Sequence, residues 1–179
     1  MSSAKLILLI ALLSMAAACG DNLSPSGEDK RPPVVAGSTG AAVGEKAPDF
    51  SVSDINGAVV TLSSSLAGRK GAVFYFTMWC PICDSHMSNM RSYVAPLFPE
   101  VGFYAVDYVS GSVPDAANAA SASGYSGGIF SILADTAHAL QNNFQATMGT
   151  TVVVDSSGVI RFNEDFRDGL RLKEELNRL

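Results

Sequence analysis

A continuous apolar run followed by two closely spaced cysteines is the feature that most constrains how this chain can fold. Residues 72–76 read Ala-Val-Phe-Tyr-Phe, and the sequence Trp-Cys-Pro-Ile-Cys occupies residues 79–83. An apolar run of β-forming residues is typical of a central strand buried on both faces. Pro81 suits the first position of a helix, because it has no N–H group to leave unpaired there. The pattern therefore predicts a buried strand over residues 72–76 that leads into a helix over residues 81–97.

Strand and helix patterns alternate along the rest of the chain. Turn signals such as Asp-Ile-Asn-Gly at residues 54–57 separate them. Strands are predicted at residues 50–53, 59–62, 101–106, 129–133, 150–154 and 159–162, and helices at residues 115–122, 137–144 and 169–179. Mixed strands and helices in this order predict a three-layer α/β sandwich.

The two cysteines of the motif indicate thiol–disulfide chemistry. Two intervening residues bring the sulfurs within bonding distance across one helical turn. The first cysteine lies at the helix N-terminus, where unpaired amides and the helix dipole favour the thiolate. Cys80 is therefore the candidate nucleophile and Cys83 the candidate resolving thiol. A structural disulfide and half of a zinc site are the alternatives, although zinc usually needs a further pair of ligands.

His86 is the candidate group that accepts the proton of Cys83. The two side chains share one face of the predicted helix, and imidazole titrates near neutral pH. The alternative is a partly exposed histidine that makes a single hydrogen bond. Trp79 is expected to lie beside the active sulfur as a contact surface. The helical face of His86 and Cys83 is also expected to carry Met90, Tyr93 and Leu97.

The N-terminal residues have the pattern of a secretory signal. Lys5 precedes an apolar run, and three alanines at residues 16–18 come directly before Cys19. The run is shorter than the ~20 residues of a membrane-spanning helix. Residues 19–45 are rich in Ser, Gly and Pro and show no apolar period, which predicts a flexible tether. The domain organisation is thus a signal at residues 1–18, a tether at residues 19–45 and a folded domain at residues 46–179.

Four segments together resemble the TlpA-like thiol–disulfide oxidoreductases of the AhpC/TSA–redoxin superfamily. They are residues 47–50, 57–62, 74–83 and 150–158. The resemblance implies a thioredoxin-like three-layer sandwich with a central mixed β-sheet. It also implies an enzyme without a cofactor that exchanges electrons with protein disulfides and with an unidentified electron donor.

The start of the chain resembles a bacterial lipoprotein signal, whose cysteine carries the lipid and becomes the mature N-terminus. In this chain that residue is Cys19, and a plain signal peptide or short anchor is the alternative. The resemblance implies a domain tethered to a membrane in the cell envelope, facing the periplasm or the exterior. A net charge of −5 argues against nucleic acid as a partner.

Two positions depart from the thioredoxin pattern. Gly149, after Met148, stands where the family places a cis-proline facing the disulfide, so a trans bond is expected there. Phe74 and His86 occupy the two places at which relatives carry a buried acid.

Two other functions remain open from the sequence. Thr77 and Cys80 match part of the peroxiredoxin motif Pro-x-x-x-Thr-x-x-Cys, but Val73 replaces its proline. A peroxidase is therefore one alternative. A Cu(I)-binding or Cu(I)-delivery protein is the other, with a soft ligand set. That set is Cys80, Cys83, His86 and Met148.

Overall fold

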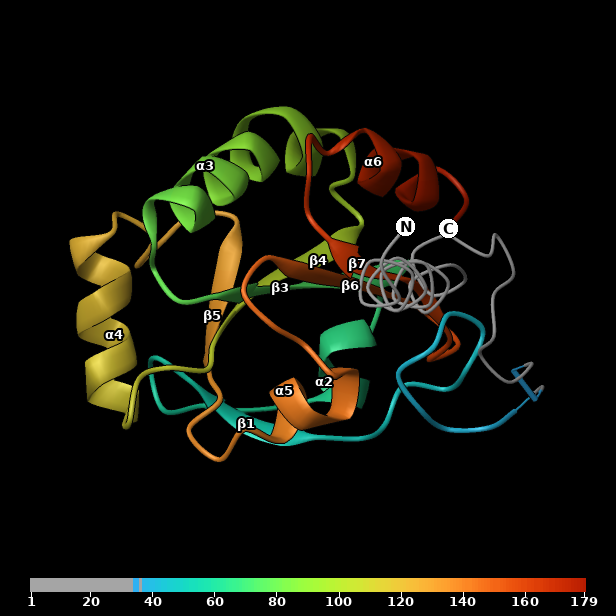
Figure 1. Cartoon of the computed structure of the whole chain (residues 1–179), viewed down its shortest axis with the longest axis horizontal. Helices are drawn as coiled ribbons and strands as arrows, with labels where there is room; N and C mark the ends of the chain where they lie inside the picture. The colour runs from blue at the N-terminus through green and yellow to red at the C-terminus, as the bar shows by residue number, and fades with distance from the viewer. Residues whose placement is uncertain (1–33, 36) are drawn as a thin grey trace, which may run out of the picture. The chain divides into compact units, whose positions relative to one another are not determined.

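A seven-stranded mixed sheet forms the centre of the computed structural model, which describes residues 34–35 and 37–179 (Figure 1). The strands are β1 (Ser51–Asp54), β2 (Val59–Thr61), β3 (Gly71–Thr77), β4 (Val101–Asp107), β5 (Phe130–Ala134), β6 (Thr150–Asp155) and β7 (Ile160–Asp165). Their order across the sheet is β2-β1-β5-β4-β3-β6-β7. β3, β4 and β5 run parallel, and the other neighbouring pairs are antiparallel. The predicted α/β fold with a mixed central sheet is confirmed.

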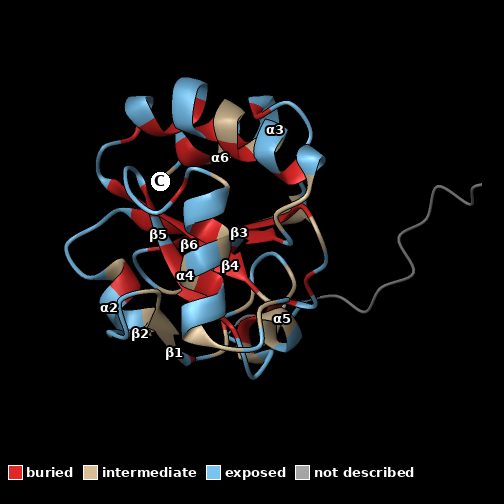
Figure 2. Cartoon of the chain, turned by 90° about the vertical axis from the view of Figure 1, so that its left-hand side faces the viewer, coloured by how far each residue is buried: buried red, intermediate tan, exposed pale blue. Residues whose placement is uncertain are grey.

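Helices cover both faces of this sheet and give it three layers. They are α2 (Leu62–Leu66), α3 (Pro81–Asn89), α4 (Val113–Ala122), α5 (Ala139–Phe144) and α6 (Leu170–Leu176). Side chains from α3, α4 and α6 share one apolar core with the sheet, and those from α2 and α5 share the other. Figure 2 shows the buried strands in red between the two helical layers.

Strand β3 lies at the middle of both cores, as its sequence predicts. All seven of its residues are buried. Because side chains alternate across a strand, Val73 and Tyr75 face α3, whereas Phe74 and Phe76 face α5. Tyr75 is therefore placed beneath the helix that carries the cysteines.

The segment predicted as one helix over residues 81–97 contains three types of helix in succession. The α-helix ends at Asn89 and continues as a π-helical turn (Met90–Val94) and a 3₁₀ turn (Ala95–Leu97). A π turn accommodates one extra residue, so the buried face moves along the chain by one position. The expectation that Tyr93 and Leu97 share the inward face is wrong: both are exposed, and Val94 and Phe98 are buried instead.

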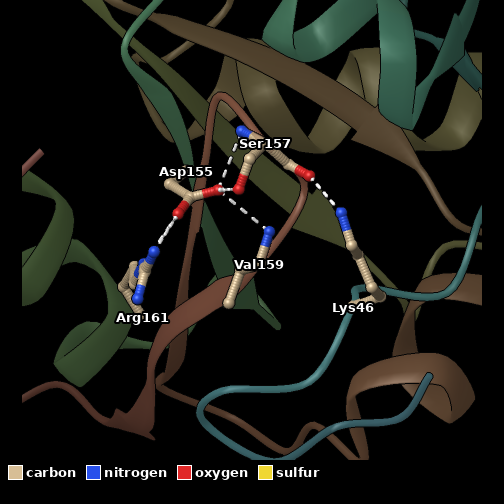
Figure 3. Close-up of polar contacts among 5 residues, drawn as sticks. All are labelled: Lys46, Asp155, Ser157, Val159 and Arg161. Atoms are coloured by element: carbon tan, nitrogen blue, oxygen red, sulfur yellow. Dashed lines mark hydrogen bonds and ion pairs between the residues drawn. The ribbon is translucent and has the colours of Figure 1, made fainter. Parts of the chain in front are cut away.

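The residues just before the predicted domain pack against the hairpin of β6 and β7. We call Ser38–Lys46 the N-terminal strap. Its Gly44 N–H donates to the Ile160 carbonyl at 2.8 Å, and Lys46 pairs with Val159. The Lys46 Nζ also donates to the Ser157 carbonyl at 2.8 Å (Figure 3).

These contacts extend the ordered part of the chain into residues that the composition assigns to a tether. The reason is that the strap is held by backbone hydrogen bonds. A pattern of periodic apolar side chains does not reveal such bonds. The predicted signal at residues 1–18, Cys19 and the first part of the tether lie outside the described residues. No helix within the described ranges combines the length and the apolar character needed to cross a membrane.

Candidate active site

The two motif cysteines lie where β3 gives way to α3. Cys80 is the N-cap of α3, and its Sγ accepts a hydrogen bond from the Cys83 N–H at 3.2 Å. Pro81 occupies the first helical turn, as predicted. Both cysteines are free thiols; Cys80 is half-buried and Cys83 is 1% exposed. A partly accessible sulfur thus lies in front of a buried one, at the helix end whose amides carry partial positive charge.

The hydrogen bonds around Cys83 control its ionisation. Burial raises the pKa of the Cys83 thiol, but a hydrogen bond from Cys80 acts in the opposite direction. Backbone groups of Met78 and Cys80 and the Thr77 side chain add to that second effect, so the pKa of Cys83 is lowered overall. The largest of the lowering contributions comes from Cys80 itself. The acidity of the buried thiol therefore depends on the state of the exposed one.

Trp79 is held in place by a buried carboxylate. Its backbone is in the left-handed region, with φ of 59°, which is uncommon for a residue other than glycine. The indole Nε1–H donates to Asp107 Oδ2 at 2.7 Å, and the Trp79 N–H donates to Thr77 Oγ1 at 3.0 Å. Asp107 is fully buried and also accepts hydrogen bonds from Val109 and Ser110. The ring orientation next to the cysteines is thereby fixed.

Tyr125 closes the site from the segment that follows α4. Its hydroxyl donates to Asp84 Oδ1 at 2.8 Å, and the Arg91 guanidinium lies 4.9 Å from its ring centroid. Burial, reinforced by the Asp84 carboxylate, raises the pKa of Tyr125 to about 12. A cavity of about 10 Å³ remains between this ring, Trp79 and the two sulfurs. Such a volume holds about one water molecule.

His86 reaches the cysteines through a tyrosine. The Tyr75 hydroxyl lies 3.0 Å from His86 Nδ1, and the Tyr75 side chain packs in the same core as Cys83. Burial, followed by the negative charge on Cys83, raises the pKa of Tyr75, so its hydroxyl keeps its proton. Burial lowers the pKa of His86, and the charge of Asp165 opposes this shift only in part. The imidazole is therefore a neutral acceptor at neutral pH.

The loop that carries Gly149 packs over His86. Gly149 has φ of 86°, its N–H donates to the Phe76 carbonyl at 3.0 Å, and its carbonyl accepts from the Phe166 N–H at 2.8 Å. A Cβ at this glycine would lie 3.7 Å from two atoms of the imidazole. Met148 packs against the core that contains Cys83. The peptide bonds of the described residues, including the one before Gly149, are all trans, as expected.

The geometry gives no support to the copper alternative. Within the part of the chain that the structure describes, no three His, Cys, Asp or Glu side chains lie close enough to hold a metal ion. The ligand set with Cys80, Cys83 and His86 would need such a cluster, whereas His86 Nδ1 faces the Tyr75 hydroxyl.

Three residues of the site are not identified from the sequence: Tyr75, Asp107 and Tyr125. Tyr75 and Asp107 carry weak signals, because each is a polar group at or near the end of an otherwise apolar strand. Tyr125 lies in a segment rich in Gly and Ser that carries no recognisable pattern.

Comparison with known proteins identifies the family of the sequence and the class of the fold. The sequence model of the AhpC/TSA family matches residues 43–163. Curated proteins yield no significant match. The structure of MTB dsbF, in its mixed oxidized and reduced forms, is 26% identical and has a TM-score of 0.58; the match covers 72% of this chain and 93% of that chain.

Two other solved structures have similar folds. The peroxidoxin BcpB from Mycobacterium tuberculosis is 19% identical with a TM-score of 0.60, covering 75% of this chain and 94% of that chain. A secreted Mycobacterium tuberculosis disulfide oxidoreductase homologous to E. coli DsbE is 22% identical with a TM-score of 0.56, covering 73% of this chain and 96% of that chain. The thioredoxin-like fold predicted from the sequence is confirmed.

Proposed function

The chain belongs to the AhpC/TSA family, and on this basis we propose that it is a TlpA-like thiol–disulfide oxidoreductase that reduces or exchanges disulfides of other proteins. One observation carries the proposal. The half-buried Cys80 sulfur caps α3 and accepts the Cys83 N–H, while the Cys83 thiol is buried directly behind it. That arrangement suits one sulfur that meets a substrate and a second that completes the exchange.

The reaction follows from the order in which the two sulfurs are accessible. In the reducing direction, the Cys80 thiolate attacks one sulfur of a substrate disulfide and releases the first substrate thiol. The Cys83 thiolate then attacks Cys80 Sγ, the mixed disulfide breaks, and the second substrate thiol leaves. The substrate gains two electrons and two protons, and the enzyme retains a Cys80–Cys83 disulfide. A dithiol electron donor restores the two thiols by the reverse exchange.

The exposed residues next to Cys80 suit contact with a polypeptide. Met78 is 45% exposed and Ile82 is 56% exposed, and they flank Cys80 on either side. Trp79, fixed by Asp107, lies between Met78 and Cys80. Exposed apolar side chains around a reactive sulfur favour a protein substrate over a small polar one.

We further propose that the domain works outside the cytoplasm, attached to a membrane by a lipid on Cys19. The signal pattern of residues 1–18 supports this location, and disulfides persist in such compartments. The solved relative homologous to DsbE is itself described as secreted. Loss of membrane association in Cys19→Ser, with unchanged reductase activity, is the expected result. Membrane association that survives this change would contradict the lipid anchor.

A thiol peroxidase is the less favoured function. The peroxiredoxin motif pairs its threonine with the nucleophilic cysteine, but the Thr77 hydroxyl accepts the Trp79 N–H at 3.0 Å. Val73, in place of the motif's proline, is fully buried inside β3.

Reduction of insulin disulfides by the full chain tests the proposed function. We expect turnover with a dithiol donor, its loss in Cys80→Ser, and a trapped mixed disulfide in Cys83→Ser. Cys19→Ser is the matched control, because it removes the remaining cysteine of the chain and none of the motif. Absence of turnover with any dithiol would refute the proposal, and consumption of peroxide in place of insulin reduction would favour the peroxidase.

A further inference from the structure

The second step of the proposed reaction needs a proton acceptor for Cys83. In the dithiol state, the hydrogen bond from Cys80 is the largest contribution that lowers the pKa of Cys83. Once Cys80 is joined to a substrate sulfur, it has no thiol proton to donate. Cys83 is then a buried thiol, and burial disfavours its charged form. The attack on Cys80 therefore requires another group that takes the proton.

Tyr75 is the polar side chain that connects Cys83 to an acceptor. It is fully buried in β3, directly beneath α3, and packs in the same core as Cys83. After burial, the charge of Cys83 is the next influence that raises the pKa of the Tyr75 hydroxyl. The same oxygen lies 3.0 Å from His86 Nδ1. Tyr75 has one hydroxyl proton, so it can accept the thiol proton of Cys83 only while it donates its own to a second group. His86 Nδ1 is placed to be that second group.

We propose that Tyr75 and His86 form a proton relay that removes the proton of Cys83 when Cys83 attacks the mixed disulfide on Cys80. This role rests on the proposed function. The Cys83 proton moves to the Tyr75 oxygen as the Tyr75 proton moves to His86 Nδ1. The products are a Cys83 thiolate, a neutral tyrosine and an imidazolium. After the attack, the departing substrate thiolate is protonated from solvent, and His86 returns its extra proton to solvent.

The surroundings of the relay favour this direction of transfer. His86 is half-buried in α3, and its ring packs on Phe166 with centroids 4.9 Å apart. The charged group that faces it from β7 is Asp165, which stabilises an imidazolium. Tyr75, from β3, packs in the core that also contains the two cysteines of the α3 terminus, and after burial their charges and that of Tyr108 raise its pKa. A neutral imidazole beside a carboxylate can take a proton and hold it briefly.

The relay takes the place of the buried acid that thioredoxin relatives carry. Phe74, at the aligned strand position, faces the opposite core, against α5. The next residue, Tyr75, faces the cysteines instead. A tyrosine cannot act as a base by itself here, because its proton is held firmly. Paired with His86, Tyr75 donates one proton as it accepts another, so its side chain stays neutral during the transfer.

The attack of Cys83 on the mixed disulfide can be followed with the aromatic disulfide DTNB. The protein used is the full chain carrying Cys19→Ser. The first equivalent of thionitrobenzoate reports the attack by Cys80, and the second reports the attack by Cys83 on the mixed disulfide. We expect Tyr75→Phe to slow the second release by about 10²-fold, the scale of general acid–base catalysis, and to leave the first unchanged. In the unsubstituted relay the second release should slow as pH falls through the pKa of His86. His86→Gln should abolish that dependence, leaving a rate that rises with ionisation of Cys83.

Matched substitutions separate a relay from a structural role. Tyr108→Phe removes a hydroxyl near the same sulfurs, and His138→Gln changes an exposed imidazole; both should leave the two releases as they are. A normal second release in Tyr75→Phe would overturn the relay. So would a second release in His86→Gln that is slowed equally at every pH. If Tyr75→Phe does not fold, the pH profile of His86→Gln decides alone. Failure of insulin reduction with both releases intact would reject the proposed function and not the relay.

Discussion

At the scale of single residues, the acidity of Cys83 depends on the side chain at position 80. Replacing Cys80 by alanine removes the hydrogen bond that contributes most to lowering the pKa of Cys83, while the burial that raises it remains. We therefore expect the pKa of Cys83 to rise in Cys80→Ala. The thiolate would then form only at higher pH. The pH dependence of alkylation of the single thiol, in a chain that also carries Cys19→Ser, measures the shift.

Cys80→Ser is the matched control for this prediction. The serine hydroxyl can still donate to Cys83, so the rise in pKa should be smaller than in Cys80→Ala. A pKa in Cys80→Ala that equals or falls below that of the intact pair would contradict the hydrogen-bond explanation.

Sequence reasoning recovers the cysteines of this site but not their partners. The roles proposed for Cys80 and Cys83 follow from five consecutive residues, whose order sets both the spacing and the helix terminus. Asp107 reaches Trp79 only because β4 pairs with β3 in a register that puts Asp107 beside Thr77. That register depends on packing between segments distant in sequence, which a single sequence does not display.

At the scale of elements, the departures from prediction have local causes. α2 is unpredicted because it is a five-residue helix with three central serines, and its start is stabilised by a capping box between Thr61 and Ser64. The π turn after α3 is unpredicted because its buried side chains break the 3.6-residue period. All seven predicted strands agree with the structure to within three residues.

The turn between β6 and β7 is an element whose stability should depend on pH. Asp155, 8% exposed, accepts hydrogen bonds from Ser157 and Val159 and pairs with Arg161 (Figure 3). Burial raises the pKa of Asp155, but these hydrogen bonds and the Arg161 charge outweigh it and lower the pKa. A carboxylate whose pKa is lower in the folded chain stabilises that chain above its unfolded pKa, near 4, and the effect fades as pH falls.

Asp155→Ala should therefore lower the free energy of unfolding by about 2 kcal/mol at pH 7, the scale of losing a charged hydrogen-bonding group. The difference from the unsubstituted chain should shrink steadily below about pH 4. Urea unfolding at several pH values measures it. Glu174→Ala, at an exposed position of α6, is the control and should change little. A difference that stays constant with pH would show that the Asp155 charge is not the cause.

At the scale of the whole domain, the two ends of β3 lie next to different features: the cysteines at one end and the N-terminal strap at the other. The cysteines follow its last residue, Thr77. Its first residue, Gly71, pairs with Asp155, next to the turn that the N-terminal strap contacts. The strap and the cysteines therefore lie at opposite ends of the central strand. Contacts made by the strap should affect the stability of the domain without changing the chemistry of the sulfurs.

Two truncated chains test this separation. A chain that starts at Ser38 keeps the strap, whereas a chain that starts at Ala47 loses its hydrogen bonds to the β6–β7 hairpin. Two of these join the strap to the backbone N–H and carbonyl of Ile160, which is fully buried. A third runs from the Asn163 side chain to the strap. At about 1 kcal/mol for each hydrogen bond lost, the shorter chain should be less stable by about 3 kcal/mol in urea unfolding.

The longer truncated chain should match the full chain closely in stability, because it retains every hydrogen bond between the strap and the β6–β7 hairpin and loses, among the described residues, only those from Ser38 to the exposed Val35. Where the shorter chain is folded, both releases of thionitrobenzoate should keep their rates, since the hydrogen bonds of Cys80, Cys83 and Tyr75 do not involve the strap. Equal stability of the two truncated chains would place the start of the domain at residue 47 or later. Slower release from a folded shorter chain would show instead that the two ends of β3 are coupled.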